Sequence, residues 1–159
     1  MTTLEQEVGD LLRRKGLTLG VVESATGGLI SHLVTSVPGS SDYYQGSITA
    51  YSNQVKTRVV GVSEDTLSKY GAVSHQVAQE MARGGRKVLA ASICLADTGI
   101  AGPGGATPGK PVGLFYIGLA GESGTESRQH NFTGDREQNK LAAARAALAW
   151  LRDYLLSLG

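Results

Sequence analysis

Apolar positions along the chain recur at two spacings, which predict alternating helices and strands. Residues 3–15 carry apolar side chains at helical spacing, after a capping box and before a glycine suited to a helix end, Gly16. The run Leu19–Val22 is short and apolar, which is typical of a buried strand. Residues 29–34 return to helical spacing, and a Pro-Gly pair ends that helix. The chain therefore begins with helix, strand and helix.

The same pattern predicts four more strands and four more helices. The strands are expected at Tyr43–Tyr51, Ala90–Ala96, Val112–Ala120 and Ser127–Phe132. The helices are expected at Asn53–Val60, at Glu64–Tyr70 with Ser63 as its cap, from Ser74 to about Leu89, and from Asp135 onward. Gly84 and Gly85 fall inside the third of these helices, where each glycine costs ~1 kcal/mol relative to alanine, so close packing against another element is expected there.

Helices alternate with strands early in the chain, and the last two strands form an antiparallel hairpin around Gly121–Gly124. This order predicts an α/β fold in which residues 1–159 form a single domain, with a mixed β-sheet covered by helices. A chain of 159 residues is long enough to bury a core without disulfides or metals.

Composition excludes several classes of protein. Fifteen basic and fourteen acidic residues leave a net charge of +1 without a basic stripe, so no nucleic-acid partner is expected. No apolar run approaches the ~20 residues of a membrane span, and no secretory signal opens the chain, so no membrane partner is expected. Cys94 is the single cysteine and the three histidines are scattered, which predicts no disulfide and no metal site. A cytoplasmic location is expected.

The turn Glu23–Gly28 carries the first candidate chemistry. Ser24 lies where the first strand ends and the next helix begins, and Gly27 and Gly28 allow the backbone to approach a ligand closely. Unpaired N–H groups in this turn suit an anion or a developing oxyanion, and Ser24 would be placed to attack a group held there. The alternative is that Ser24 or Thr26 is only a helix N-cap.

A second polar cluster, Tyr51–Lys56, follows the next predicted strand. Tyr51 is expected at the end of the strand, and Lys56 about one turn into the helix. Lys56 could be solvated surface, or a general base if burial lowers its pKa from about 10.4. Ser–Lys chemistry requires that second environment.

A glycine-rich stretch, Asp97–Gly105, follows the strand at Ala90–Ala96. Gly104–Lys110 fits the beginning of a P-loop, but Pro111 stands where Ser or Thr should bind magnesium, and a strand follows instead of a helix, so an NTPase is rejected. The backbone N–H groups of this stretch form either an anion-binding nest or a plain surface turn.

Six stretches in order make nearly the whole chain resemble one family, that of the C-terminal domain of the competence/damage-inducible protein CinA. They are Glu23–Gly28, Pro38–Ser41, Thr49–Asn53, Gly71–Ser74, Thr98–Pro103 and Lys110–Gly113. The resemblance implies a three-layer fold and a nicotinamide-nucleotide amidase, which hydrolyses nicotinamide mononucleotide to nicotinate mononucleotide and ammonia. It also implies a stand-alone form of the domain, a homodimer or higher homo-oligomer, and no cofactor.

By the same resemblance, Ser24 matches the nucleophile, Lys56 its general base, and Tyr51 a tyrosine placed with them. Ser41 matches a further active-site serine. Ala25 stands where many members have cysteine, and Thr98 replaces a common serine. The substrate-binding residues are expected to be Thr26, Gly27, Gly28, Ser41, Gly102 and Gly104.

The expected mechanism begins with attack of Ser24 on the amide carbonyl while neutral Lys56 removes its proton, with Tyr51 orienting or relaying that proton. Backbone N–H groups near Thr26–Gly28 would hold the oxyanion. Two alternatives stay open at this point. One is a nucleotide-binding domain without turnover, and the other is a related hydrolase of small amides or esters.

Overall fold

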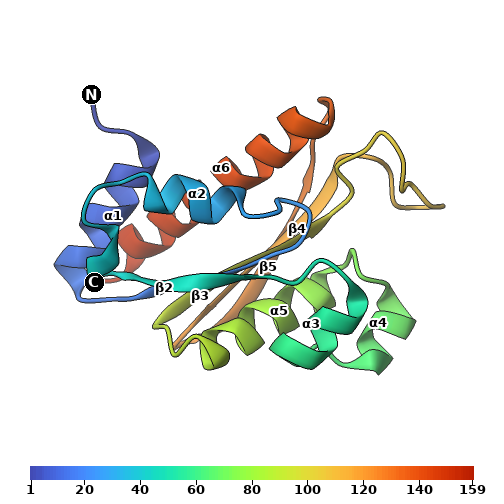
Figure 1. Ribbon diagram of the computed structural model, residues 1–159, viewed down its shortest axis with the longest axis horizontal. Helices are drawn as coiled ribbons and strands as arrows, with labels where there is room; N and C mark the ends of the chain where they lie inside the picture. The colour runs from blue at the N-terminus through green and yellow to red at the C-terminus, as the bar shows by residue number, and fades with distance from the viewer.

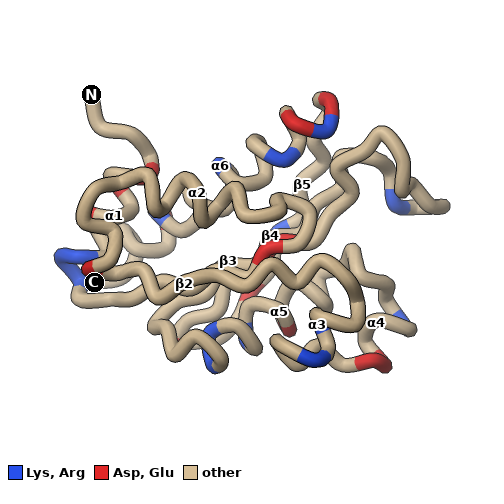
Figure 2. Tube along the Cα trace, in the orientation of Figure 1, with Lys and Arg blue, Asp and Glu red and all other residues tan.

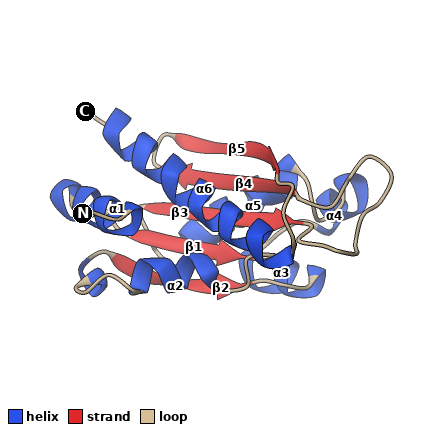
Figure 3. Cartoon of the chain, turned by 90° about the horizontal axis from the view of Figure 1, so that it is seen from above, coloured by secondary structure: helices blue, strands red, loops and turns tan.

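The computed structural model describes all 159 residues and contains one five-stranded sheet between two layers of helices (Figures 1 and 3). The strands are β1 (Leu19–Glu23), β2 (Tyr44–Thr49), β3 (Ile93–Gly99), β4 (Leu114–Gly121) and β5 (Gly124–Asn131). Their order across the sheet is β2-β1-β3-β4-β5. β1, β2 and β3 run parallel, whereas β4 and β5 are antiparallel to their neighbours. The predicted mixed sheet covered by helices is confirmed.

The helices divide between the two faces of the sheet (Figure 1). One face is covered by α1 (Leu4–Lys15), α2 (Leu29–Thr35) and α6 (Arg136–Ser157). The other is covered by α3 (Asn53–Val60), α4 (Glu64–Tyr70) and α5 (His75–Val88). Each layer encloses its own apolar cluster, with Leu148 and Leu151 buried on the first face and Val77 and Met81 on the second. Basic and acidic residues are scattered along the trace in Figure 2.

Most of the predicted helix ends are confirmed, with one exception. Thr3 and Asp135 each form a full capping box with the glutamine three residues later, and Gly16 ends α1 in the left-handed conformation. Ser74 caps α5 by accepting from a backbone N–H. Ser63 precedes α4 as predicted, but its side chain forms no capping hydrogen bond.

Most strand boundaries differ from the sequence prediction by one or two residues, and the difference is larger in β3 and β5. β3 begins at Ile93 and continues to Gly99, because it pairs with β4 as far as the Gly99–Phe115 position. The beginning of the predicted glycine-rich loop therefore belongs to the sheet. β5 is shifted toward the turn and covers residues 124–131. After α2 the chain forms a short 3₁₀ turn, η1 (Ser40–Asp42).

The two glycines inside α5 allow the close packing that the sequence predicts. A Cβ on Gly84 would lie 1.7 Å from the carbonyl oxygen of Val60 in α3, and one on Gly85 would lie 2.2 Å from Val22 in β1. α5 therefore touches both its neighbouring helix and the sheet directly. No helix in the structure is both long enough and apolar enough for a membrane span.

Candidate active site

The site lies where the parallel strands end, because the carboxyl ends of β1 and β2 meet at one edge of the sheet. Ser24 follows β1 directly and is 7 % exposed. The chain after β2 leads through Tyr51 into α3, whose N-cap Ser52 accepts a hydrogen bond from a backbone N–H. α3 then places Lys56 Nζ 3.1 Å from Ser24 Oγ. The structure therefore brings together the two residues that the sequence proposes as nucleophile and base.

Lys56 is one of the largest buried side chains of the protein, with 2 % of its surface exposed. It forms no ion pair, and its Nζ donates to Ser24 Oγ and, over 2.8 Å, to the carbonyl oxygen of Tyr51. Burial lowers the pKa of Lys56, and the nearby Asp97 carboxyl opposes that shift. The alternative of a solvated surface lysine is therefore wrong, and the environment favours the neutral amine that a general base requires.

A cavity of about 320 Å³ opens over this pair. Its walls come from the residues after β1, from the segment joining β2 to α3, from Ala72 and Val73 before α5, from residues 98–105, and from Arg136 of α6. Thr98 fixes two of these walls together by donating to the carbonyl oxygen of Ala72 over 2.7 Å. This volume falls within the range of small-molecule sites.

Tyr51 lies at the mouth of the cavity and is 62 % exposed. Its carbonyl oxygen accepts from Lys56, whereas its phenol oxygen accepts from Arg136 Nη2 over 3.4 Å. Arg136 also donates through Nη1 to the carbonyl oxygen of Gly102 over 2.7 Å. The Tyr51 ring therefore faces the entrance with Arg136, and the contact of Tyr51 with Lys56 is made by the backbone.

A buried carboxyl, Asp97 of β3, binds the backbone of the loop that carries Ser24. Asp97 Oδ2 accepts from the Ser24 N–H over 3.2 Å, and Oδ1 accepts from the Thr26 N–H over 3.1 Å. Burial raises the pKa of Asp97 to about 6. The sequence prediction missed this residue because it placed Asp97 in a loop. The signal that could have found it was a lone acid following an apolar strand run.

Glu23 and Thr26 complete this buried network. Glu23 accepts from the backbone N–H groups of Ile30 and Ser31 over 2.9 and 3.0 Å. The Thr26 hydroxyl lies 2.6 Å from Glu23 Oε1 and also contacts Asp97 Oδ2. Thr26 is thus neither a helix cap nor a group facing the cavity, but a bridge between two buried carboxyls.

Two of the N–H groups that the sequence analysis assigned to an oxyanion are already used. The Thr26 N–H is bound to Asp97, and the Gly27 N–H donates to the Ser24 carbonyl oxygen over 3.1 Å. The N–H of Ala25 has no acceptor within the chain, and Ala25 lines the cavity. The residue directly after the nucleophile therefore offers the free donor on the cavity side.

The expected substrate-binding residues divide between two regions. Gly102 and Gly104 line the Ser24 cavity, and their N–H groups have no acceptor within the chain. Thr26, Gly27 and Gly28 instead border a separate cavity of about 510 Å³ between α2 and α6. Ser41 lies in η1, before β2 begins, and so at the opposite end of the strands from Ser24. The structure does not bring these last four residues into the Ser24 cavity.

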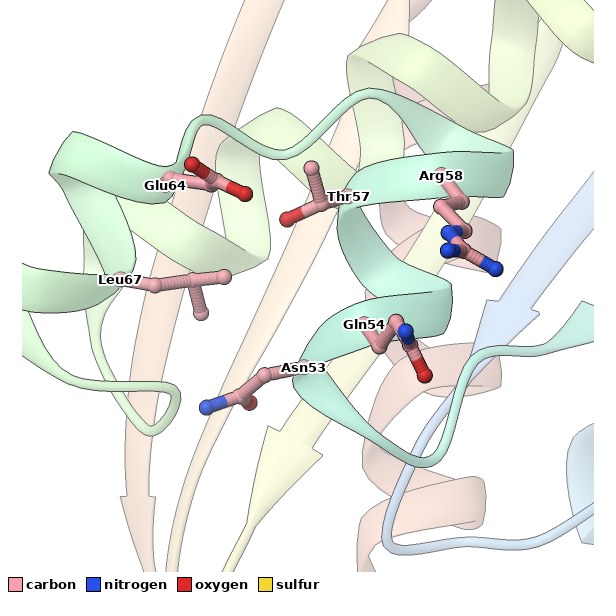
Figure 4. A pocket seen from close by; sticks show the side chains of 6 residues that line it. All are labelled: Asn53, Gln54, Thr57, Arg58, Glu64 and Leu67. Atoms are coloured by element: carbon pink, nitrogen blue, oxygen red, sulfur yellow. The ribbon is translucent and has the colours of Figure 1, made fainter.

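A neighbouring cavity of about 410 Å³ lies between α3 and α4 (Figure 4). Its lining residues are Asn53, Gln54, Thr57, Arg58, Glu64 and Leu67. Asn53 borders both this cavity and the Ser24 cavity. No three His, Cys, Asp or Glu side chains anywhere in the structure gather as a metal site.

Comparisons with known proteins agree over nearly the whole chain. The family described as "CinA C-terminal domain" matches residues 1–155. A CinA-like protein of Salinibacter ruber is 50 % identical over 153 residues, which are 96 % of this chain and 37 % of that protein. A CinA-like protein of Thermotoga neapolitana is 48 % identical over 156 residues, 98 % of this chain and 38 % of that protein. The chain thus spans less than two fifths of the length of these relatives.

Solved structures match the fold closely. The competence damage-inducible protein A from Klebsiella pneumoniae superposes with a TM-score of 0.95 at 31 % identity, covering 98 % of this chain and 97 % of that chain. The competence/damage inducible protein CihA from Agrobacterium tumefaciens gives a TM-score of 0.88 at 34 % identity, covering 99 % and 100 %. The three-layer arrangement is therefore shared with these proteins.

Proposed function

Because this chain belongs to the CinA C-terminal domain family, we propose that it is the amidohydrolase that the sequence motifs imply, one that converts nicotinamide mononucleotide to nicotinate mononucleotide and ammonia. The observation that carries this proposal is the contact of 3.1 Å between Lys56 Nζ and Ser24 Oγ. A buried amine without an ion pair, touching a serine hydroxyl at the floor of a small-molecule cavity, is what Ser–Lys amide hydrolysis needs.

In the first half of the reaction, neutral Lys56 takes the Ser24 proton as Oγ forms a bond to the carboxamide carbon. The Ala25 N–H supplies a donor for the oxyanion, a contact whose loss typically raises the barrier by ~3 kcal/mol. Lys56 then returns the proton to the amide nitrogen, the C–N bond breaks, and ammonia leaves. The nicotinyl group remains as an ester on Ser24.

In the second half, water attacks the ester carbonyl while Lys56 accepts one proton from that water. The bond between the acyl carbon and Ser24 Oγ breaks, and the protonated Lys56 restores the serine hydroxyl. No Tyr51 phenol is needed in this path, because Lys56 contacts Ser24 directly. The products are nicotinate mononucleotide and the original enzyme.

The entrance of the cavity suits the phosphate of the substrate. Arg136 supplies a guanidinium there, and Gly102 and Gly104 supply backbone N–H groups without acceptors. Guanidinium groups and successive N–H groups both bind phosphate oxygens. This arrangement would hold the anionic end of the nucleotide outside the reacting pair.

The test is to incubate the purified protein with nicotinamide mononucleotide and to measure ammonia and nicotinate mononucleotide. We expect both products in equal amounts, and their loss in Ser24→Ala with an unchanged thermal transition. Saturable nucleotide binding without ammonia would instead indicate a binding domain. Faster turnover of other amides would indicate a different hydrolase, and near-normal turnover by Ser24→Ala would reject the mechanism.

A further inference from the structure

The Thr26 hydroxyl contacts two buried carboxyls, and it has too few protons to hydrogen-bond both of them if both are ionised. Thr26 Oγ1 touches Glu23 Oε1 and Asp97 Oδ2 at hydrogen-bonding distance. A threonine hydroxyl carries one proton and so can donate to only one of them. The other oxygen would face the hydroxyl oxygen without a hydrogen between them, in an interior where both carboxyls are 0 % exposed.

Each carboxyl receives one backbone N–H on each oxygen, but only the donors to Glu23 belong to the first turn of a helix. Glu23 receives two N–H groups from the beginning of α2, one on each oxygen, in addition to the Thr26 hydroxyl. These first-turn N–H groups lie at the positive end of the α2 dipole, which favours the ionised form of Glu23. Asp97 receives one N–H on each oxygen, and its remaining contact is with the hydroxyl oxygen of Thr26.

From this geometry we infer that Asp97 carries a proton in the working protein and donates it to Thr26 Oγ1, which in turn donates to Glu23. Asp97 is then a neutral positioning residue, which holds the Ser24 loop without placing a negative charge beside Lys56. The chain of donors runs Asp97 to Thr26 to Glu23, and every buried oxygen in it is satisfied.

The surroundings of Asp97 agree with this assignment. The charged groups that act on Asp97 are Glu23 of β1 and Lys56 of α3. The residue paired with Asp97 on the neighbouring strand β4 is the apolar Ile117. Burial raises the pKa of Asp97 to about 6 even when the Thr26 hydroxyl donates to it, a contact that lowers the pKa. With the Thr26 hydroxyl donating to Glu23, as inferred, that lowering contact is absent, which favours the protonated form of Asp97.

The consequence for the proposed function is a lower pKa for Lys56. The Asp97 charge is the influence that raises the pKa of Lys56. A protonated Asp97 removes it, so the amine is more readily neutral at the pH where it must accept the Ser24 proton. This consequence for Lys56 rests on the proposed amidase function, whereas the assignment of the proton to Asp97 does not depend on that function.

The position of the proton can be measured by infrared spectroscopy near pH 7, since a protonated carboxyl absorbs apart from carboxylates. We expect a protonated-carboxyl band in the wild type that disappears in Asp97→Asn and persists in Asp65→Asn, a matched change at an exposed position of α4. Absence of the band in the wild type, or its persistence in Asp97→Asn, would overturn the inference, whether or not the protein releases ammonia.

The activity of conservative variants provides a second test. In Asp97→Asn the amide can donate to Thr26, and one N–H contact with Ser24 is lost, so we expect ammonia release to fall only about five- to tenfold. Asp97→Ala, which removes the whole support, should lose far more. The acid limb of the pH profile, set by Lys56, should keep its position in Asp97→Asn. A limb shifted to lower pH would show that Asp97 is ionised in the wild type and would contradict the inference.

Discussion

Lys56 Nζ lies 3.1 Å from Ser24 Oγ, although 32 positions separate the two residues in the sequence. The contact exists because β1 and β2 are parallel neighbours, so that the ends of both strands meet at one edge of the sheet. The same geometry buries the amine, and its hydrogen-bond acceptors are the Ser24 hydroxyl and the Tyr51 carbonyl oxygen, not a carboxylate. A lysine held in this way destabilises its own charged form, which is the property that a general base uses.

Lys56→Arg tests whether the residue must lose its proton. A guanidinium stays protonated at any working pH and cannot accept the Ser24 proton. We expect ammonia release to fall by about 100-fold to 10,000-fold, the usual contribution of a general base. Lys69→Arg, at an exposed position in α4, is the matched control and should keep its rate. Comparable rates for Lys56→Arg and the wild type would remove Lys56 from the proton path.

Lys56→Met tests the stability cost of burying the amine. Because burial lowers the pKa of Lys56 below 10.5, the unfolded chain binds a proton that the folded chain does not, between the lowered pKa and 10.5. The stability of the wild type therefore rises with pH through this window. Methionine removes the penalty, so we expect Lys56→Met to raise Tm at pH 7 by about 2–4 °C, the shift for ~1 kcal/mol in a domain of this size.

The pH dependence of that difference separates charge from packing. We expect the advantage of Lys56→Met in Tm to shrink as the pH approaches 10.5, because the unfolded lysine then loses its proton as well. Thermal unfolding followed by circular dichroism at pH 7, 8, 9 and 10 would measure it. An advantage that stays constant over this range would mean that packing alone causes it.

Asp97 makes the stability of the wild type fall with rising pH, the opposite of the effect of Lys56, and Asp97→Asn should remove that fall. Burial raises the pKa of Asp97 above 3.8 on folding, so the stability due to its bound proton is complete below pH 3.8 and is lost as the pH rises through the raised pKa of the folded protein. Asparagine does not titrate. Urea unfolding from pH 4 to pH 7 should therefore show the wild type losing stability relative to Asp97→Asn. A constant difference would mean that folding leaves the Asp97 pKa where it was.

The local signals in the sequence predict most of the fold. Helix periodicity and the capping box at Thr3 place the helices correctly, because both depend on contacts within three or four residues. The length of β3 was not predictable in this way. Its last residues, Asp97–Gly99, join the sheet only by pairing with β4, a strand that comes later in the chain. Local pattern carries no information on such a pairing.

In the candidate site, too, some features could be predicted from the sequence and others depend on contacts between distant residues. The family resemblance pairs Ser24 with Lys56, and the structure gives the physical reason: each residue follows a parallel strand, and the two strands end together. The orientation of Tyr51 could not be predicted, because its phenol is held by Arg136, which lies 85 positions away. The Ala25 donor could not be predicted either, since Asp97 and the Ser24 carbonyl oxygen remove the N–H groups of Thr26 and Gly27 from use.

Gly84→Ala tests the packing between α5 and α3. Alanine is the better helix former by ~1 kcal/mol, so the change would stabilise an isolated helix. In the protein its Cβ would lie 1.7 Å from the Val60 carbonyl oxygen, which is backbone and cannot rotate away. We expect a net destabilisation of about 1–3 kcal/mol, measured by urea unfolding. Arg83→Ala, exposed on the same helix, should change stability little, and a stabilised Gly84→Ala would show that α3 shifts freely.

Arg136→Ala tests where the phosphate of the substrate binds. Arg136 is held at the cavity entrance by its contacts with Gly102 and Tyr51, so its guanidinium is already positioned for an anion. Removal of a charged hydrogen bond costs ~1.5–3 kcal/mol, so we expect KM for nicotinamide mononucleotide to rise about 10-fold to 150-fold with kcat nearly retained. The riboside, which has no phosphate, should be hydrolysed equally by Arg136→Ala and the wild type.

A second arginine offers a matched control for that experiment. Arg58 lines the neighbouring cavity between α3 and α4, which adjoins the Ser24 cavity at Asn53 (Figure 4). If the phosphate lies at the Gly102–Gly105 entrance, Arg58→Ala should leave KM for both substrates unchanged. A larger effect from Arg58→Ala than from Arg136→Ala would place the phosphate beyond Asn53 instead. If Arg136→Ala lowers kcat/KM equally for the nucleotide and the riboside, this arginine orders the entrance through Tyr51 and Gly102 and does not bind the phosphate.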